Sequence, residues 1–94
     1  MRSWTQWRDE VIEQAASMAS AAGWRVRSVH IASTGSAYVR LEADQARGLA
    51  EVRIATHAPH PERAKRSWLF NVDQRDPFAL WCLFAWLHKR RSQA

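Results

Sequence analysis

The segment THAPHPERAKRS, residues 56–67, gathers the side chains best suited to chemistry. Its basic side chains are His57, His60, Arg63, Lys65 and Arg66. Guanidinium and ammonium groups bind phosphate and carboxylate oxygens, so the segment is a candidate for contact with a nucleic-acid backbone or with an acidic protein surface. It is too long for a tight hairpin, and long loops in small domains often carry function. A solvated connector would have the same composition, and that alternative stays open.

Metal and catalytic chemistry find little support in the chain. His57 and His60 have a spacing that could suit a metal ion, but no cysteine stands near them and the nearest acid is Glu62. Two histidines alone are weak evidence for a zinc site. Neither a nucleophile elbow nor a phosphate loop is present, and Glu51, Glu62 and Asp73 show no pattern typical of a metal-dependent nuclease. We therefore expect a protein that is not an enzyme and needs no cofactor.

A second unusual feature is the run FALWCLFAWL, residues 78–87, in which no side chain is charged. It is too short to cross a bilayer, which takes about 20 residues. On a helical wheel one face collects the residues that we expect to pack on a sheet: Leu80, Leu83, Phe84 and Leu87. Trp81 and Trp86 flank this face on opposite sides. The far side is also apolar, with Phe78, Cys82 and Ala85.

Three explanations of this all-round apolar helix stay open. It can be wedged between the sheet and the first helix, because such helices are usually buried on more than one side. Its outer side can be an interface with another protein or with a second copy of the chain, where tryptophans often dominate the binding energy. It can also lie on a membrane surface, with the cationic residues 88–91 facing lipid phosphates.

The rest of the chain predicts the elements that position these segments. Apolar residues recur at three- and four-residue spacing, which predicts a helix over about residues 3–22, capped by Ser3 and ended by Gly23. From Arg27 the spacing changes to two, which predicts an antiparallel meander. The predicted strands are residues 27–32, 38–42, 51–55 and 68–72. Asp76 and Pro77 are typical of the start of a final helix.

One face of this sheet is expected to be polar. It would present Ser28, His30, Tyr38, Arg40, Glu42, Glu51 and Arg53. Because the charges are mixed, we expect cross-strand pairs such as Arg40 with Glu51 rather than a binding stripe. A single Tyr38 is a poor platform for stacking bases.

These elements predict one α+β domain, residues 1–94, in the order αββββα. It would have two layers, with an antiparallel sheet of three to four strands and both helices on one face. The formal net charge is +5, and the excess lies in residues 48–94, where eight Lys or Arg stand against four acids. A single cysteine, Cys82, fits a reducing compartment, and the charged N-terminus is not a signal peptide. We therefore expect a cytoplasmic protein without a membrane span.

Two strand segments resemble a pattern of small orphan proteins from phages and mobile elements. They are SAYVRL, residues 36–41, and VRIATH, residues 52–57, the second followed by a loop with prolines. The resemblance covers these two segments and implies a mobile-element accessory protein. Such proteins commonly bind and block host machinery, as anti-CRISPR proteins do. Many anti-CRISPR proteins are acidic DNA mimics, and this basic chain departs from that pattern.

The leading interpretation is a non-enzymatic inhibitor that binds a host protein or nucleoprotein complex. The residues expected to bind this partner are Arg63, Lys65, Arg66, Trp81 and Trp86. The alternative is a small basic nucleic-acid-binding accessory protein. Its contact residues would be Arg53, His57, Arg63, Lys65, Arg66, Lys89, Arg90 and Arg91. A third interpretation is a structural homodimer through the C-terminal helix.

Overall fold

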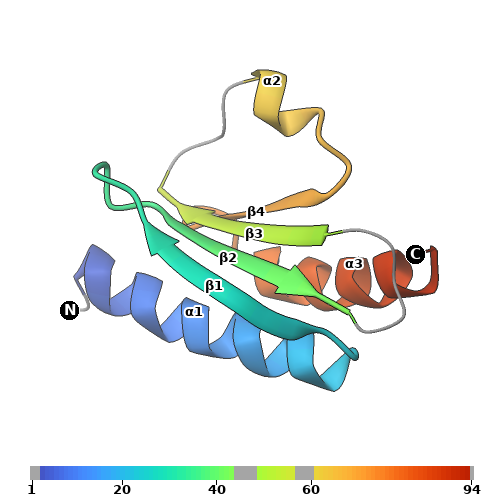
Figure 1. The fold of residues 1–94 in the computed structure, drawn as a ribbon. Coiled ribbons are helices and arrows are strands. Elements are labelled where there is room, and N and C mark those ends of the chain that lie inside the picture. Colours follow the sequence, from blue (N-terminus) through green and yellow to red (C-terminus); the bar gives the residue numbers. More distant parts are fainter. Residues whose placement is uncertain (1–2, 44–48, 57–60, 94) are drawn as a thin grey trace.

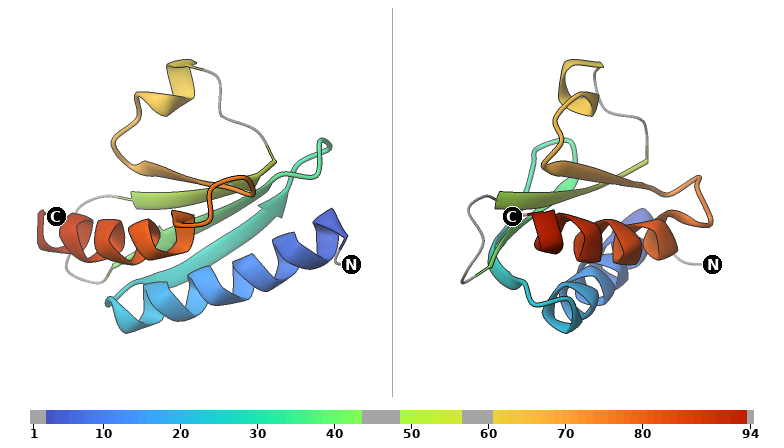
Figure 2. Two further views of the ribbon diagram at one scale, coloured as in Figure 1. Left: turned by 180° about the vertical axis from the view of Figure 1, so that it is seen from behind. Right: turned by 90° about the vertical axis from the view of Figure 1, so that its right-hand side faces the viewer.

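The structure is a computed structural model that describes residues 3–43, 49–56 and 61–93. Its elements in chain order are α1 (Trp4–Ala21), β1 (Arg25–Ile31), β2 (Ala37–Glu42), β3 (Leu49–Ala55), α2 (Pro61–Ala64), β4 (Leu69–Asp73) and α3 (Ala79–Gln93). The strands form one sheet in the order β1-β2-β3-β4. Helices α1 and α3 lie against one face of the sheet, and the short helix α2 stands over the other (Figures 1 and 2). The predicted α+β order of helix, four strands and helix is confirmed, and α2 is an addition to it.

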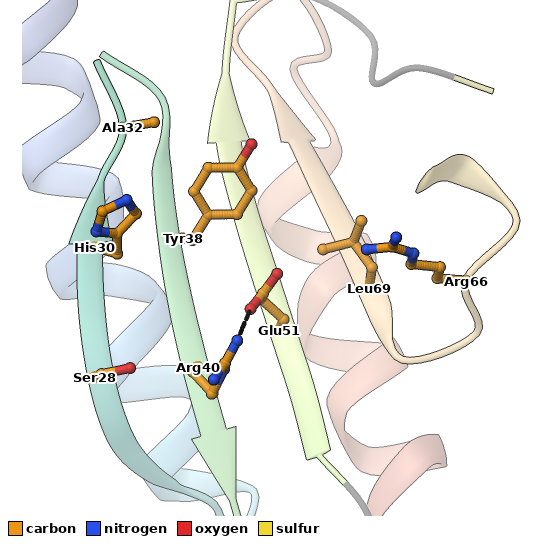
Figure 3. Close-up of a pocket in the computed structure, with 8 residues that line it drawn as sticks. All are labelled: Ser28, His30, Ala32, Tyr38, Arg40, Glu51, Arg66 and Leu69. Atoms are coloured by element: carbon orange, nitrogen blue, oxygen red, sulfur yellow. Dashed lines mark hydrogen bonds and ion pairs between the residues drawn. The ribbon is translucent and has the colours of Figure 1, made fainter. Parts of the chain in front are cut away.

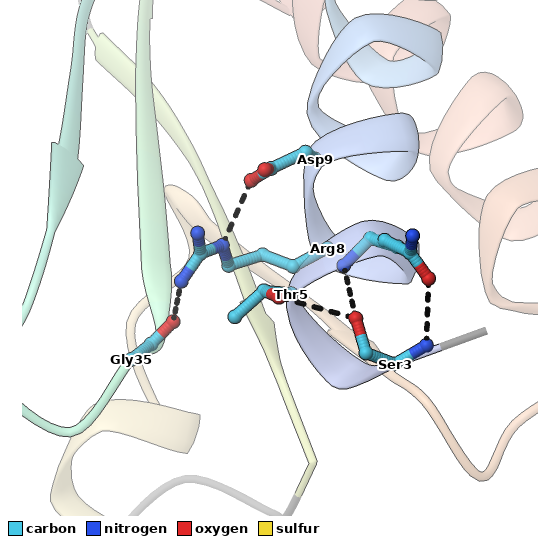
Figure 4. A network of polar contacts seen from close by, with 6 residues as sticks. Ser3, Thr5, Arg8, Asp9 and Gly35 are labelled. Carbon is cyan, nitrogen blue, oxygen red and sulfur yellow. Dashed lines mark hydrogen bonds and ion pairs between the residues drawn. The ribbon is translucent and has the colours of Figure 1, made fainter.

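Helix α1 begins and ends at the predicted signals. The Ser3 hydroxyl accepts a hydrogen bond from the Gln6 N–H at 3.2 Å, while the Gln6 side chain accepts from the Ser3 N–H at 2.9 Å (Figure 4). This reciprocal capping box satisfies two donors that the first turn leaves unpaired. Just past the helix, Gly23 has a φ of +88°, a conformation that glycine adopts without strain. The Arg8 guanidinium donates to the carbonyl of Gly35 at 3.0 Å and ties α1 to the β1–β2 turn.

The sheet is mixed, which corrects the prediction that it would be antiparallel throughout. β1 with β2 and β2 with β3 pair antiparallel, whereas β4 pairs parallel with β3. Parallel neighbours need a crossover connection of about a dozen residues or more, and residues 56–68 supply one. The alternating side chains of a short strand look the same in either direction, so strand periodicity could not distinguish the two pairings.

A bulge in β1 corrects the face that was predicted for Arg27, whereas the predicted faces of residues 28–31 are confirmed. The register shifts between Val26 and Ser28, so that Val26 lies opposite Leu41 and Val29 lies opposite Val39. Strict alternation, with Ser28 and His30 on the polar face, had instead predicted that Arg27 lies on the buried face. An extra residue of this kind moves every side chain before it to the other face of the sheet. The bulge therefore lets Val26, Val29 and Ile31 share the helix-facing side of an exposed edge strand.

The core lies between the sheet and the two long helices. The sheet contributes fully buried side chains, among them Val39, Leu41, Val52 and Ile54. Helix α1 adds Val11, Ala15 and Ala19, and α3 adds Leu83 and Leu87. Buried Trp24, between α1 and β1, donates its indole N–H to the Leu87 carbonyl at 3.1 Å. This bond fixes α3 beside the end of α1.

Candidate functional site

Helix α3 buries one side and exposes the other. Leu83 and Leu87 are fully buried, as the helical wheel predicted, and Leu80 is half-buried. Phe84 was predicted to pack on the sheet, and this was wrong, because its side chain is 41% exposed. The Phe84 ring instead packs edge-on against the His88 ring, with centroids 4.5 Å apart. The buried stripe is thus narrower than the wheel indicated, since Leu83 and Leu87 are fully buried whereas Phe84 is exposed.

The opposite side of α3 and the residue just before it carry an apolar surface that we call the α3 stripe. It consists of the exposed residues Phe78, Trp81, Cys82, Phe84 and Ala85. Trp81 is 77% exposed and Phe78 is 64% exposed, the largest values among the exposed large hydrophobic residues of the described chain. His88 and Lys89 are also exposed one turn further on. The wedged-helix explanation therefore holds for one side of α3 only, and the other side is an exposed apolar surface.

The two tryptophans of α3 have different surroundings. Trp81 lies on the α3 stripe. Trp86 is half-buried and packs on Phe70 of β4, with ring centroids 5.4 Å apart at 45°. The Arg90 guanidinium lies 5.8 Å from the centroid of the Trp86 ring. Of the two tryptophans predicted to bind a partner, only Trp81 presents most of its surface to solvent.

The three cations at the end of α3 also differ in their surroundings. Arg90 donates to the Leu49 carbonyl through Nε at 3.1 Å and through an Nη at 2.7 Å, and to the Ser67 carbonyl at 3.4 Å. It thereby joins α3 to the start of β3 and to the end of the crossover. Arg91 is half-buried beside Gly23, whereas Lys89 is exposed. Of these three cations, Lys89 is the one whose side chain is exposed to solvent.

The basic crossover lies on the other side of the molecule. Lys65 and Arg66 are exposed, and they belong to the segment that follows α2 over the sheet face opposite α3 (Figure 1). The predicted partner-binding residues Arg66 and Trp81 therefore belong to different faces. Arg63 is part of α2, but its side chain is outside the described structure, as is the whole of His57. The predicted nucleic-acid set is divided in the same way, since Lys89 belongs to the helix layer.

Charged residues on the outer sheet face pair with one another. Arg40 and Glu51 form the expected cross-strand pair, 3.4 Å apart. Arg53 is only 5% exposed and donates to the side-chain oxygen of Asn71 at 3.3 Å, so it has little surface to offer to a phosphate. At the end of β4 the Arg75 guanidinium lies 2.7 Å from the Asp73 carboxylate. Hydrogen bonds from the side chain and the backbone N–H of Arg75 lower the pKa of Asp73 from 3.8 to about 2.

A cavity of about 510 Å³ lies between this outer face and the crossover (Figure 3). Its lining residues are Ser28, His30, Ala32, Tyr38, Arg40, Glu51, Arg66 and Leu69. Sequence reasoning missed it, because it treated Tyr38 and Arg40 as plain sheet surface and Arg66 as part of a separate loop. The length of segment 56–68 was the one signal for it, since a crossover of that length can reach over a sheet.

In residues 3–43, 49–56 and 61–93, no three His, Cys, Asp or Glu side chains are grouped so that they could hold a metal ion. In the same ranges, no helix combines the length and the apolar character needed to cross a membrane.

Comparison of the chain with protein-family models, with curated proteins and with solved structures finds no match.

Proposed function

We propose that the chain is a non-enzymatic protein-binding module that docks through the α3 stripe. The observation that carries this proposal is the exposure of Trp81, at 77%, next to Phe78, at 64%. Two large aromatic side chains three residues apart at the start of a helix form a continuous apolar surface on one side of it. A surface of this kind costs solubility and is typical of a site that a partner covers.

The α3 stripe has the composition of an interface centre. Tryptophan is among the residues that contribute most binding energy when they insert into a partner's pocket. The stripe is built on a helix whose other side is locked into the core by Leu83 and Leu87. A rigid helix that presents apolar residues at three- and four-residue spacing fits a hydrophobic groove of another protein. Docking would then need little ordering of the chain, which favours affinity.

Charge indicates the chemistry of the partner. The stripe leads at its C-terminal end into His88 and Lys89, both exposed, and the chain has a formal net charge of +5. An apolar groove with an acidic rim would complement this surface and speed its association. Together with the resemblance of residues 36–41 and 52–57 to mobile-element proteins, this supports a host protein complex as the target and inhibition by occlusion as the outcome.

Capture of the partner by matched variants tests the proposal. The variant Phe78→Ser with Trp81→Ala removes two exposed aromatic side chains from the α3 stripe. The control, Val29→Thr with Ile31→Thr, removes two exposed apolar side chains from β1 and keeps the β-branched shape that strands favour. Tagged wild-type and control chains should retain the same protein from a bacterial host extract. The α3 variant should retain at least about thirtyfold less, since a central tryptophan contributes about 2 kcal/mol or more.

Two results would contradict the proposal. One is equal retention by the α3 variant and the wild type. The other is a wild-type chain that sediments as a dimer and becomes a monomer in the α3 variant, because the stripe would then be occupied by a second copy.

A further inference from the structure

The cavity on the outer sheet face combines groups that come from distant parts of the chain. Its floor is formed by side chains of β1, β2, β3 and β4, and Arg66 reaches it from the crossover (Figure 3). Its volume, about 510 Å³, is in the range of small-ligand sites. This surface is separate from the α3 stripe, which lies on the helix layer.

One part of the cavity is aromatic. Tyr38 of β2 lies beside His30 of β1, with ring centroids 6.4 Å apart and ring planes at 37°. The two residues are directly opposite each other in the β1–β2 register. Buried Leu69 of β4 extends the apolar floor. Tyr38 is thus not the isolated ring that its place in the sequence suggested, and the pair offers a surface on which a flat ring can stack.

The other part of the cavity is charged. Arg66 is exposed, and its guanidinium carbon lies 5.2 Å from the centroid of the Trp68 ring. A guanidinium that contacts an aromatic face still has its in-plane N–H donors available for an anion. Arg40 of β2 pairs with Glu51 of β3, and the Glu51 carboxylate lines the cavity (Figure 3). The cavity therefore offers a stacking surface, an anion-binding cation and a hydrogen-bond acceptor.

We propose that this cavity binds a nucleotide unit with an unpaired base. The base would stack on Tyr38 and His30, the phosphate would bind Arg66, and base amino or ring N–H groups would donate to Glu51. Stacking and guanidinium–phosphate contacts are the usual means by which proteins hold single-stranded nucleic acid. An acidic peptide fits less well, because its acidic side chains offer no flat ring for the aromatic side. The nucleotide unit can be free or part of a single strand.

Binding of a labelled single-stranded DNA of about twelve nucleotides, followed by fluorescence anisotropy, tests this proposal. Arg66→Gln is compared with Arg27→Gln, which removes the same charge from an exposed residue outside the cavity. Tyr38→Leu is compared with Tyr38→Phe, which keeps the ring. We expect affinity to fall about tenfold in Arg66→Gln and at least about fivefold in Tyr38→Leu, with changes below about twofold in both controls. Thermal unfolding of each variant separates lost binding from lost folding.

Competitors distinguish the source of the ligand. If adenosine monophosphate displaces the labelled strand and inorganic phosphate does not, the cavity is assigned to free nucleotides. Displacement only by unlabelled single strands would assign it to nucleic acid, and both results support the proposal. Equal losses in Arg66→Gln and Arg27→Gln would overturn it, because binding would then follow overall charge. So would tighter binding of duplex DNA or of an acidic peptide, or the absence of binding.

Discussion

The indole Nε1 of Trp24 donates a hydrogen bond to the carbonyl oxygen of Leu87, 3.1 Å away, and joins the start of the sheet to α3. Trp24 is buried, and so is the Leu87 side chain. The bond and the packing of Leu87 together fix how α3 is rotated about its axis. That rotation places Leu83 in the core and leaves Trp81 in solvent. The α3 stripe is therefore a consequence of the fold rather than of an unpacked helix.

Loss of the Trp24 N–H should destabilise the fold. Trp24→Phe keeps an aromatic ring in the core but removes the donor, and we expect the free energy of unfolding to fall by about 1–3 kcal/mol. Urea unfolding measures this change. Trp81→Phe is the matched control, because its side chain is exposed, and it should stay within about 0.5 kcal/mol of the wild type. Equal effects of the two substitutions would contradict the role given to Trp24.

The two sides of α3 should respond differently to truncation. Leu83→Ala opens a cavity in the core and should cost about 2–5 kcal/mol of unfolding free energy. Trp81→Ala removes a larger side chain, yet it should change this free energy by less than about 0.5 kcal/mol. Thermal and urea unfolding of both variants provide the measurement. A strongly destabilised Trp81→Ala would mean that Trp81 is buried, and that the α3 stripe is not a free surface.

Arg90 should stabilise the fold through its geometry rather than its charge. Arg90→Lys keeps the charge but cannot reproduce the forked contacts with the Leu49 and Ser67 carbonyls. We expect a loss of about 1–2 kcal/mol in unfolding free energy. Lys89→Gln removes the charge of the neighbouring exposed residue and should stay within about 0.5 kcal/mol. If Lys89→Gln lowered the free energy of unfolding more than Arg90→Lys does, the contacts of Arg90 would contribute little to stability.

The pair of Asp73 and Arg75 predicts a pH dependence of stability. The pKa of Asp73 is lowered from 3.8 to about 2, so the folded state favours the ionised carboxylate. The stabilisation is therefore fully present above pH 3.8 and is lost as the pH falls through about 2. Urea unfolding of wild type and Asp73→Asn should show a difference that shrinks across this window.

The partner residue provides the control for that titration. In an Arg75→Gln background, the pH-dependent part of the Asp73→Asn effect should shrink, because the side-chain hydrogen bond that lowers the pKa most is gone while the backbone N–H of residue 75 still donates to the carboxylate. A pH-dependent part of equal size in both backgrounds, or none in the wild-type background, would show that the side-chain hydrogen bond from Arg75 does not set this pKa.

Local signals predicted most of the fold. Residues that are close in the sequence determine the cap at Ser3, the left-handed turn at Gly23 and the change from helical to alternating spacing near residue 27. The structure agrees with all three predictions. The parallel pairing of β4 depends instead on the path of a long connection. The bulge near Arg27 adds a residue that strict alternation cannot show.

The candidate sites were predicted less completely, for a related reason. The wheel placed Trp81 and Trp86 symmetrically beside the apolar face, so the sequence could not distinguish the exposed tryptophan from the half-buried one. Contacts at long range, such as Trp24 with Leu87 and Trp86 with Phe70, decide between them. The cavity could not be predicted for the same reason, because Arg66 and Tyr38 are far apart in the sequence and only the path of the crossover brings Arg66 to the face that carries Tyr38.

Site-specific photo-crosslinking at residue 81 tests the proposed docking surface most directly. A benzophenone amino acid replaces Trp81 in one chain and exposed Glu13 of α1 in a control chain, and both are irradiated in host cells. A docking role predicts a covalent adduct with a different protein from position 81 and none from position 13. Three results would contradict the proposal that α3 binds a host partner. They are the absence of an adduct at position 81, the same adducts at both positions, and an adduct that forms only between two copies of the chain.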